Sequence, residues 1–135
     1  MYECHWWAAL RWADEVSNTE AQMSAIRQAI DQARSGFSME DITTPGNDLR
    51  VVYVHGIRNH RVASIERLFA VIANEAPESY GLLYVQGDED ERGLEFENCF
   101  RVWRLTRGAI AELADPFLSP CVPAIELPYD AAADE

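Results

Sequence analysis

The chain contains no lysine, and all 11 of its basic residues are arginines. Against them stand 23 acidic residues, which give a formal net charge of −12 at pH 7. A surface of this charge repels phosphates and therefore disfavours DNA and RNA as partners. It favours long-range steering toward a basic protein. The same charge also fits a merely soluble acidic protein, so it does not define a function by itself.

Long apolar runs and paired cysteines are missing too. No stretch is apolar over the length needed to cross a bilayer, and no basic stretch followed by an apolar one opens the chain. We therefore expect no membrane association, no signal peptide and a cytoplasmic location. Cys4, Cys99 and Cys121 are odd in number and widely spaced, which indicates reduced thiols rather than a disulfide framework.

What the sequence does hold is enough apolar material for one core. Its 135 residues are 48% hydrophobic, a size and composition at which a domain needs neither disulfides nor metals. No repeat, linker or low-complexity segment divides the chain. We expect one domain over residues 1–135.

Residues 2–12 alternate with period two, which predicts a strand. Its even positions are apolar, so Trp6 is expected in the core. Trp7 shares the opposite face with Glu3 and Arg11. There it is either covered by a further layer or exposed as an interface anchor, a role that tryptophan often takes.

Two helices and four further strands follow. Ser17–Glu20 matches a capping box, and apolar residues at helical spacing continue to Ala33. A second amphipathic helix begins at Val62 and ends before Pro77. The remaining elements are strands over residues 49–54, 80–85, 98–105 and 109–113, with His55-Gly56 ending the first of these and a turn-rich loop over Asp41–Asp48 preceding it.

The element order is therefore β-α-β-α-β-β-β. Two helical connections place both helices on one face of the sheet, and the last strands form antiparallel hairpins. We expect an α+β fold, a two-layer sandwich with two helices on a mixed or mainly antiparallel sheet. The sequence leaves the order of the strands in that sheet open.

The acidic run Asp88–Glu91 lies between Gly87 and Gly93. It lacks the ligand spacing of a helix–loop–helix calcium site, so it is either a solvated hairpin loop or a contact for a basic partner. No neighbouring group desolvates one carboxylate and separates its pKa from the others, so catalytic carboxylates are not expected there. The histidines and cysteines also lack metal-ligand spacing, and we predict no metal and no cofactor.

A cysteine nucleophile would need a histidine brought close by the fold. His55, at the predicted end of a strand, and Cys121, between prolines, are the only pair worth weighing, and the sequence gives no further support for them. Neither a glycine-flanked serine elbow nor a phosphate-cradling loop is present. We assign no catalytic residue and do not expect an enzyme.

The C-terminal run Asp115–Pro123 carries three prolines among apolar residues. Proline disfavours a helix or an inner strand. Because Phe117, Leu118 and Ile125 are apolar, we expect a rigid extended segment that packs across the domain and closes its core, with Cys121 buried and inert.

Three segments together resemble the immunity protein 7 family of bacterial polymorphic toxin systems. They are Tyr2–Trp7, Ser79–Tyr84 and Asp115–Cys121. The acidic Asp88–Asp90 and the turn Arg107-Gly108 fit the same pattern, which has a glycine where this chain has Trp6.

The resemblance implies a small cytosolic protein that binds a toxin encoded by the neighbouring gene and neutralises it in the producing cell. It carries over no catalytic residue. The expected partner is the toxin's C-terminal domain, basic in charge, such as a nuclease, although a nucleotide-transferring toxin also fits. The predicted contact residues are Asp88, Glu89, Asp90, Glu91, Glu95, Glu97 and Trp7.

Two alternatives stay open at this point. One is an enzyme that reverses a toxin's modification, using His55 with a cysteine or a carboxylate. The other is a structural adaptor with no toxin partner.

Overall fold

The structure of the protein is a computed structural model. It describes residues 1–13, 19–33, 38–44, 49–60, 63–87, 92 and 94–134. The strands are β1 (Tyr2–Leu10), β2 (Ser38–Thr44), β3 (Leu49–Arg58), β4 (Tyr80–Gly87), β5 (Arg101–Thr106) and β6 (Ala109–Ala114). The helices are α1 (Glu20–Ala33), α2 (Ala63–Glu75), the short α3 (Leu94–Glu97) and α4 (Cys121–Ala124), and the 3₁₀ helix η1 (Ala131–Asp134).

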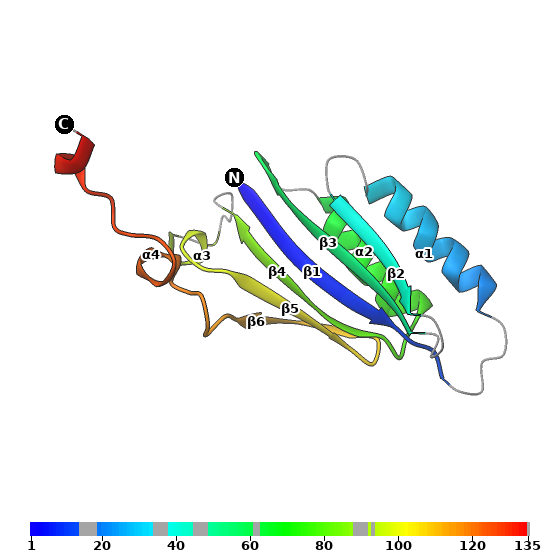
Figure 1. The fold of residues 1–135 in the computed structure, drawn as a ribbon. Coiled ribbons are helices and arrows are strands. Elements are labelled where there is room, and N and C mark those ends of the chain that lie inside the picture. The colour runs from blue at the N-terminus through cyan, green and yellow to red at the C-terminus, as the bar shows by residue number, and fades with distance from the viewer. Residues whose placement is uncertain are drawn as a thin grey trace.

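The strands form one six-stranded sheet in the order β2-β3-β1-β4-β5-β6. Every neighbouring pair is antiparallel. The two long helices α1 and α2 lie on the same face of this sheet (Figure 1). The expected α+β sandwich of two helices on an antiparallel sheet is thus confirmed.

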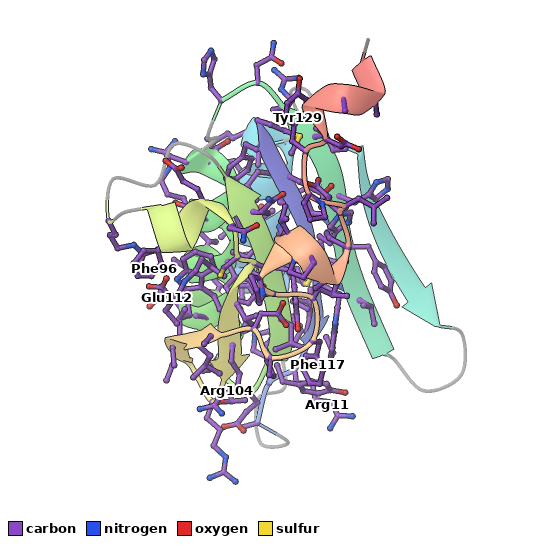
Figure 2. All side chains as sticks on the ribbon, turned by 90° about the vertical axis from the view of Figure 1, so that its left-hand side faces the viewer. Arg11, Phe96, Arg104, Glu112, Phe117 and Tyr129 are labelled. Atoms are coloured by element: carbon purple, nitrogen blue, oxygen red, sulfur yellow. The ribbon has the colours of Figure 1, made fainter. Side chains whose placement is uncertain are left out.

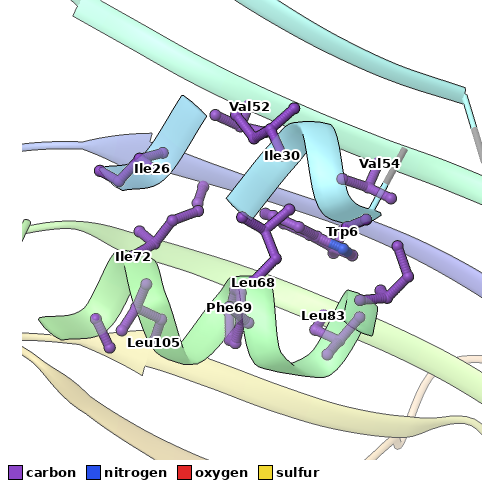
Figure 3. Close-up of a cluster of buried hydrophobic side chains, with 14 of the residues drawn as sticks. Trp6, Ile26, Ile30, Val52, Val54, Leu68, Phe69, Ile72, Leu83 and Leu105 are labelled. Carbon is purple, nitrogen blue, oxygen red and sulfur yellow. The ribbon is translucent and has the colours of Figure 1, made fainter. Parts of the chain in front are cut away.

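The core lies between that sheet face and the two helices, as Figure 3 shows. Strand β1 buries its even positions, in agreement with the period of its sequence. The Trp6 ring meets the ring of Phe69 edge-on, with centroids 5.4 Å apart. The helices contribute the buried residues Met23, Ile26 and Ile30 from α1 and Ile65, Leu68, Phe69 and Ile72 from α2.

Two strands differ from expectation. Residues 41–44, predicted as loop, belong to β2, because Ser38–Thr44 pair with the part of β3 from His55 to Leu49. Strand β3 does not end at His55-Gly56 but continues to Arg58, because the first residues of β1 pair with it there. In both places inter-strand hydrogen bonding outweighs the local turn signals of the sequence.

The element boundaries elsewhere are close to those predicted. The first strand is shorter than expected and ends at Leu10 rather than at Trp12. Strand β5 begins only at Arg101, after α3. Arg107 and Gly108 both have positive φ, 50° and 75°, which fits a tight two-residue hairpin turn between β5 and β6. The predicted capping residues before Thr19 lie outside the described residues.

Strands β1 and β4 approach so closely at Gly81 that no side chain fits between them. A Cβ atom at this position would collide with the carbonyl oxygen of Trp7 and would lie 2.8 Å from the Cα of Ala8. Because backbone rather than a flexible side chain blocks the position, Gly81→Ala is expected to lower the free energy of unfolding by about 3 kcal/mol.

The matched control is Gly87→Ala at the other end of β4. Its Cβ would lie 3.6 Å from the ring of Tyr2, an ordinary van der Waals contact, so a change below about 1 kcal/mol is expected. Urea denaturation of both variants provides the measurement. Equal losses of stability in the two would contradict the close approach.

Candidate functional site

The second face of the sheet carries the side chains that the helices do not cover. Odd positions of β1 point to this face, and the strand register sets Tyr53 beside Trp7 and His55 beside His5. On the other side of β1, Leu82 of β4 is the direct neighbour of Trp7. The centre of this face is therefore built from β3, β1 and β4.

Trp7, Tyr53, Tyr80 and Arg11 form what we call the aromatic patch. The rings of Trp7 and Tyr80 meet edge-on with centroids 5.9 Å apart, and the Arg11 guanidinium lies 5.6 Å from the centre of the Tyr80 ring. Trp7 is half-buried by these contacts, whereas Tyr53 and Tyr80 are 42% and 38% exposed. Tryptophan, tyrosine and arginine are the residue types enriched at binding hot spots.

The segment that follows β6, residues 115–122, lies against another part of the same face, and we call it the strap. It is held by the carboxylate of Asp115, which is buried. This carboxylate accepts hydrogen bonds from the backbone N–H of Phe117 (2.9 Å) and of Leu118 (3.0 Å). It also accepts from the hydroxyls of Ser119 (2.8 Å) and Tyr84 (3.2 Å).

These bonds set the ionisation of Asp115. Burial alone would raise the pKa of its carboxyl group, but the hydrogen bonds from the strap and from Tyr84 outweigh burial and hold the pKa below its usual value. The charged form is therefore the one that stabilises the strap.

A second set of polar contacts fixes the far end of the strap. The Ser119 hydroxyl accepts from the backbone N–H of Phe100 at 2.8 Å. The Asn98 side-chain amide forms two hydrogen bonds with the backbone of Val122. It accepts one from the Val122 N–H at 2.8 Å and donates one to the Val122 carbonyl at 3.1 Å. The backbone N–H of Cys121 donates to the carbonyl of Asn98 at 2.6 Å.

The predicted burial of the apolar strap residues is wrong. Phe117 is 76% exposed, and Leu118 and Ile125 are exposed as well. Because polar bonds to Asp115 and Asn98 hold the segment, its apolar side chains are free to face solvent. Arg11, Arg104 and Phe117 lie toward the same end of the molecule, whereas Tyr129 lies at the opposite end (Figure 2).

The predicted contact residues are only partly within the described part of the chain. Asp88, Glu89, Asp90 and Glu91 lie outside the described residues, and so does the side chain of Glu95. Glu97 is half-buried at the end of α3, where its backbone carbonyl accepts from the Gln86 amide at 3.4 Å. Trp7 lies in the aromatic patch.

A charged cluster directly after the acidic run was not predicted. The guanidinium groups of Arg92 and Arg101 lie over the Phe96 ring, 4.3 Å and 4.7 Å from its centroid. One oxygen of Glu112 accepts from both arginines at 2.8 Å. Burial raises the pKa of Glu112, but the two arginines outweigh it and lower the pKa overall. These residues are far apart in the sequence, and only the adjacency of α3, β5 and β6 unites them.

The thiols are in settings that oppose nucleophilic chemistry. Burial, with the nearby Glu3, raises the pKa of Cys4 to about 12. Burial also raises the pKa of Cys121. His55 lies on the face of β3 opposite to the one that Cys4 faces from β1, since Cys4 pairs with Gly56 and points into the core.

Within the described ranges, no three of the His, Cys, Asp and Glu side chains gather closely enough to hold a metal ion. In the same part of the chain, no helix is long and apolar enough to span a bilayer.

The fold and this surface define a two-layer α+β protein that exposes an aromatic patch on a sheet face. The sequence model described as immunity protein 7 matches residues 1–127, so the chain belongs to the immunity protein 7 family. Membership in this family implies an immunity protein against a toxin. No curated protein matches the chain in a sequence comparison.

The strap gives a prediction with a defined pH dependence. Asp115→Asn removes a charged acceptor from four donors and is expected to lower the free energy of unfolding at pH 7 by about 2 kcal/mol. Because the folded-state pKa lies below the unfolded value of about 3.9, this stabilisation is present above that pH and is lost as the pH falls through the folded-state pKa.

Urea denaturation at pH 7 and near pH 2.5 measures the difference. The control is Asp130→Asn, which alters an exposed carboxylate that accepts a hydrogen bond from the Ala132 N–H at 3.0 Å and is expected to change stability by less than about 0.5 kcal/mol. A deficit of Asp115→Asn that stays constant over this pH range would contradict the role of the carboxylate charge.

Proposed function

We propose that this protein neutralises a cognate toxin by binding the toxin's C-terminal domain directly, in the cytoplasm of the cell that produces both. It acts as a stoichiometric inhibitor and not as an enzyme. The observation that carries the proposal is the aromatic patch, in which exposed tyrosines and an exposed arginine surround the half-buried Trp7 on the sheet of an immunity family member.

The patch has the physical properties of a binding anchor. Trp7 is packed against Tyr80, and Tyr80 against Arg11, so these side chains lose little conformational freedom when a partner covers them. Trp7 lies on β1, a strand in the interior of the sheet that is bonded on both sides. Large amphipathic rings on a rigid support supply contact area at low entropic cost.

The acidic residues have a different part in the proposal. Asp88, Glu89, Asp90 and Glu91, with Glu95 and Glu97 nearby, are proposed to attract a basic toxin domain, such as a nuclease, and to contact it at the rim. Charges of this kind act mainly on the rate of association.

The direct experiment is co-purification with the C-terminal domain of the toxin encoded by the neighbouring gene, followed by calorimetric titration. A stable equimolar complex is expected. Failure of the purified proteins to associate would overturn the proposed function.

Tyr53→Ala tests the patch. Removal of this half-exposed ring from the centre of the contact is expected to weaken toxin binding by about 2 kcal/mol, or roughly thirtyfold, with little effect on folding. Tyr129→Ala is the matched control, because it removes the same side chain from an exposed position at the other end of the molecule. Equal affinities for the two variants would count against the patch as the contact.

Replacement of Asp88, Glu89, Asp90 and Glu91 with serine tests the acidic run. Association is expected to slow by about tenfold at low ionic strength and to depend less on salt, because the steering charge is removed. The control set replaces four carboxylates on α1 and α2, namely Glu20, Asp31, Glu66 and Glu75. Stopped-flow measurement of the association rates of both variants separates the effect of the acidic run from that of the overall charge. A role specific to the acidic run is rejected if both sets of replacements slow association equally.

A further inference from the structure

Strand β6 is one edge of the sheet, and it pairs only with β5. Two apolar side chains on it, Ile110 and Leu113, are each 39% exposed. They point to opposite faces, since side chains alternate along a strand. An exposed edge strand is a ready template for pairing with another chain.

The register shows which backbone groups of β6 face outward. Residues that flank a two-residue hairpin turn form a hydrogen-bonded pair, and such pairs alternate along the ladder. Thr106 and Ala109 are that first pair, so β6 residues 109, 111 and 113 bond to β5. The N–H and C=O groups of Ile110, Glu112 and Ala114 therefore point away from the sheet, and no backbone group of another described segment bonds them.

Edge strands are commonly guarded by charges or proline. The sequence of β2, the other edge, contains Glu40 and Asp41. Strand β6 reads Ala-Ile-Ala-Glu-Leu-Ala, and its one charge, Glu112, is bonded to Arg92 and Arg101. The β6 strand thus carries no proline, and its one charge is already paired, so little on this strand opposes the addition of another strand.

Two arginines beside this edge lack an acidic partner. Arg104 and Arg107 are exposed, and neither forms an ion pair with any of the described residues. Arg104 is the cross-strand neighbour of Ala111, whose methyl group leaves room for the guanidinium to extend over β6. A strand added about 5 Å beyond β6 would bring a carboxylate within its reach.

From these observations we infer that the outer edge of β6 takes up an extended strand of the toxin domain by main-chain pairing. That strand carries an apolar side chain on each face, to meet Ile110 and Leu113, and a carboxylate opposite Ala111, to meet Arg104. A second copy of this chain is the poorer occupant, because two molecules of net charge −12 repel each other. The inference rests on the proposed function and adds a surface to it.

Amide hydrogen exchange, read by NMR on the free protein and on its complex with the toxin domain, tests the inference. The amides of Ile110, Glu112 and Ala114 are expected to exchange rapidly in the free protein and at least about 100-fold more slowly in the complex. The amides of Ala109, Ala111 and Leu113 bond to β5 and serve as the protected reference in both states.

A pair of variants at one position separates backbone pairing from side-chain contact. Ile110→Pro removes the outward N–H without removing a bond to β5, whereas Ile110→Ala shortens the side chain and keeps the N–H. The proline variant is expected to bind the toxin domain at least about tenfold more weakly than the alanine variant. Thermal unfolding of both verifies that they are folded, and the exchange experiment on the unaltered protein does not depend on them.

Three outcomes would overturn the inference, and they differ in what they say about the proposed function. A complex in which the three outward amides stay unprotected overturns the strand pairing and leaves the proposed function intact. A free protein that sediments as a dimer with those amides already protected assigns the edge to a second copy and overturns the inference. If no complex forms at all, the proposed function fails and this inference fails with it.

Discussion

The pairing of β1 with both β3 and β4 is the constraint on which the rest of the domain depends. Because β1 is bonded on both sides, its alternation decides what each face of the sheet presents. Trp6 is buried under the helices, and Trp7, one residue on, faces the uncovered side. Gly81 makes this arrangement possible by letting β4 approach the backbone of β1 closely. A shift of one residue would exchange the side chains of the core with those of the aromatic patch.

The strap adds a second constraint, and it is polar. The buried carboxylate of Asp115 accepts hydrogen bonds from two backbone N–H groups and two hydroxyls. These bonds fix the chain as it leaves β6. Buried charges are tolerated when hydrogen bonds of this number compensate them. Phe117 of this segment is exposed to solvent at the same end of the molecule as Arg11 and Arg104.

In the proposed complex, long-range attraction and close contact come from different residues. Net charge is strongly negative, yet the aromatic patch and the β5–β6 hairpin carry the exposed arginines Arg11, Arg104 and Arg107. In the proposed mode, the acids bring a basic toxin domain near, and aromatic, arginine and backbone groups on the sheet form the contact. This division agrees with the general finding that charge governs association rates more than affinity.

The sequence predicted well those elements whose pattern is strong and local. The period of residues 2–10 and the helical spacing around Ile26 and Leu68 led to the correct elements and the correct core face. The strand Ser38–Thr44 was not predicted, because only its pairing with β3 makes it a strand.

Contacts between residues far apart in the chain could not be predicted from the sequence. Nothing local indicates that Asp115 would meet Tyr84, and without that contact burial of Phe117 was the reasonable expectation. The Arg92–Glu112 pair likewise joins residues brought together only by the fold. Parity on β1 placed Trp7 on the face opposite the core and left open whether another layer covers it, whereas its contact with Tyr80 required the β1–β4 register.

Stoichiometric binding, the proposed basis of protection, can be measured by titrating toxin activity. A fixed amount of purified toxin domain is mixed with increasing amounts of this protein, and the toxin's remaining activity is measured. A stoichiometric inhibitor gives a linear fall to zero at an equimolar ratio. Complete protection at a small fraction of an equivalent, increasing with time, would reveal turnover and contradict stoichiometric binding.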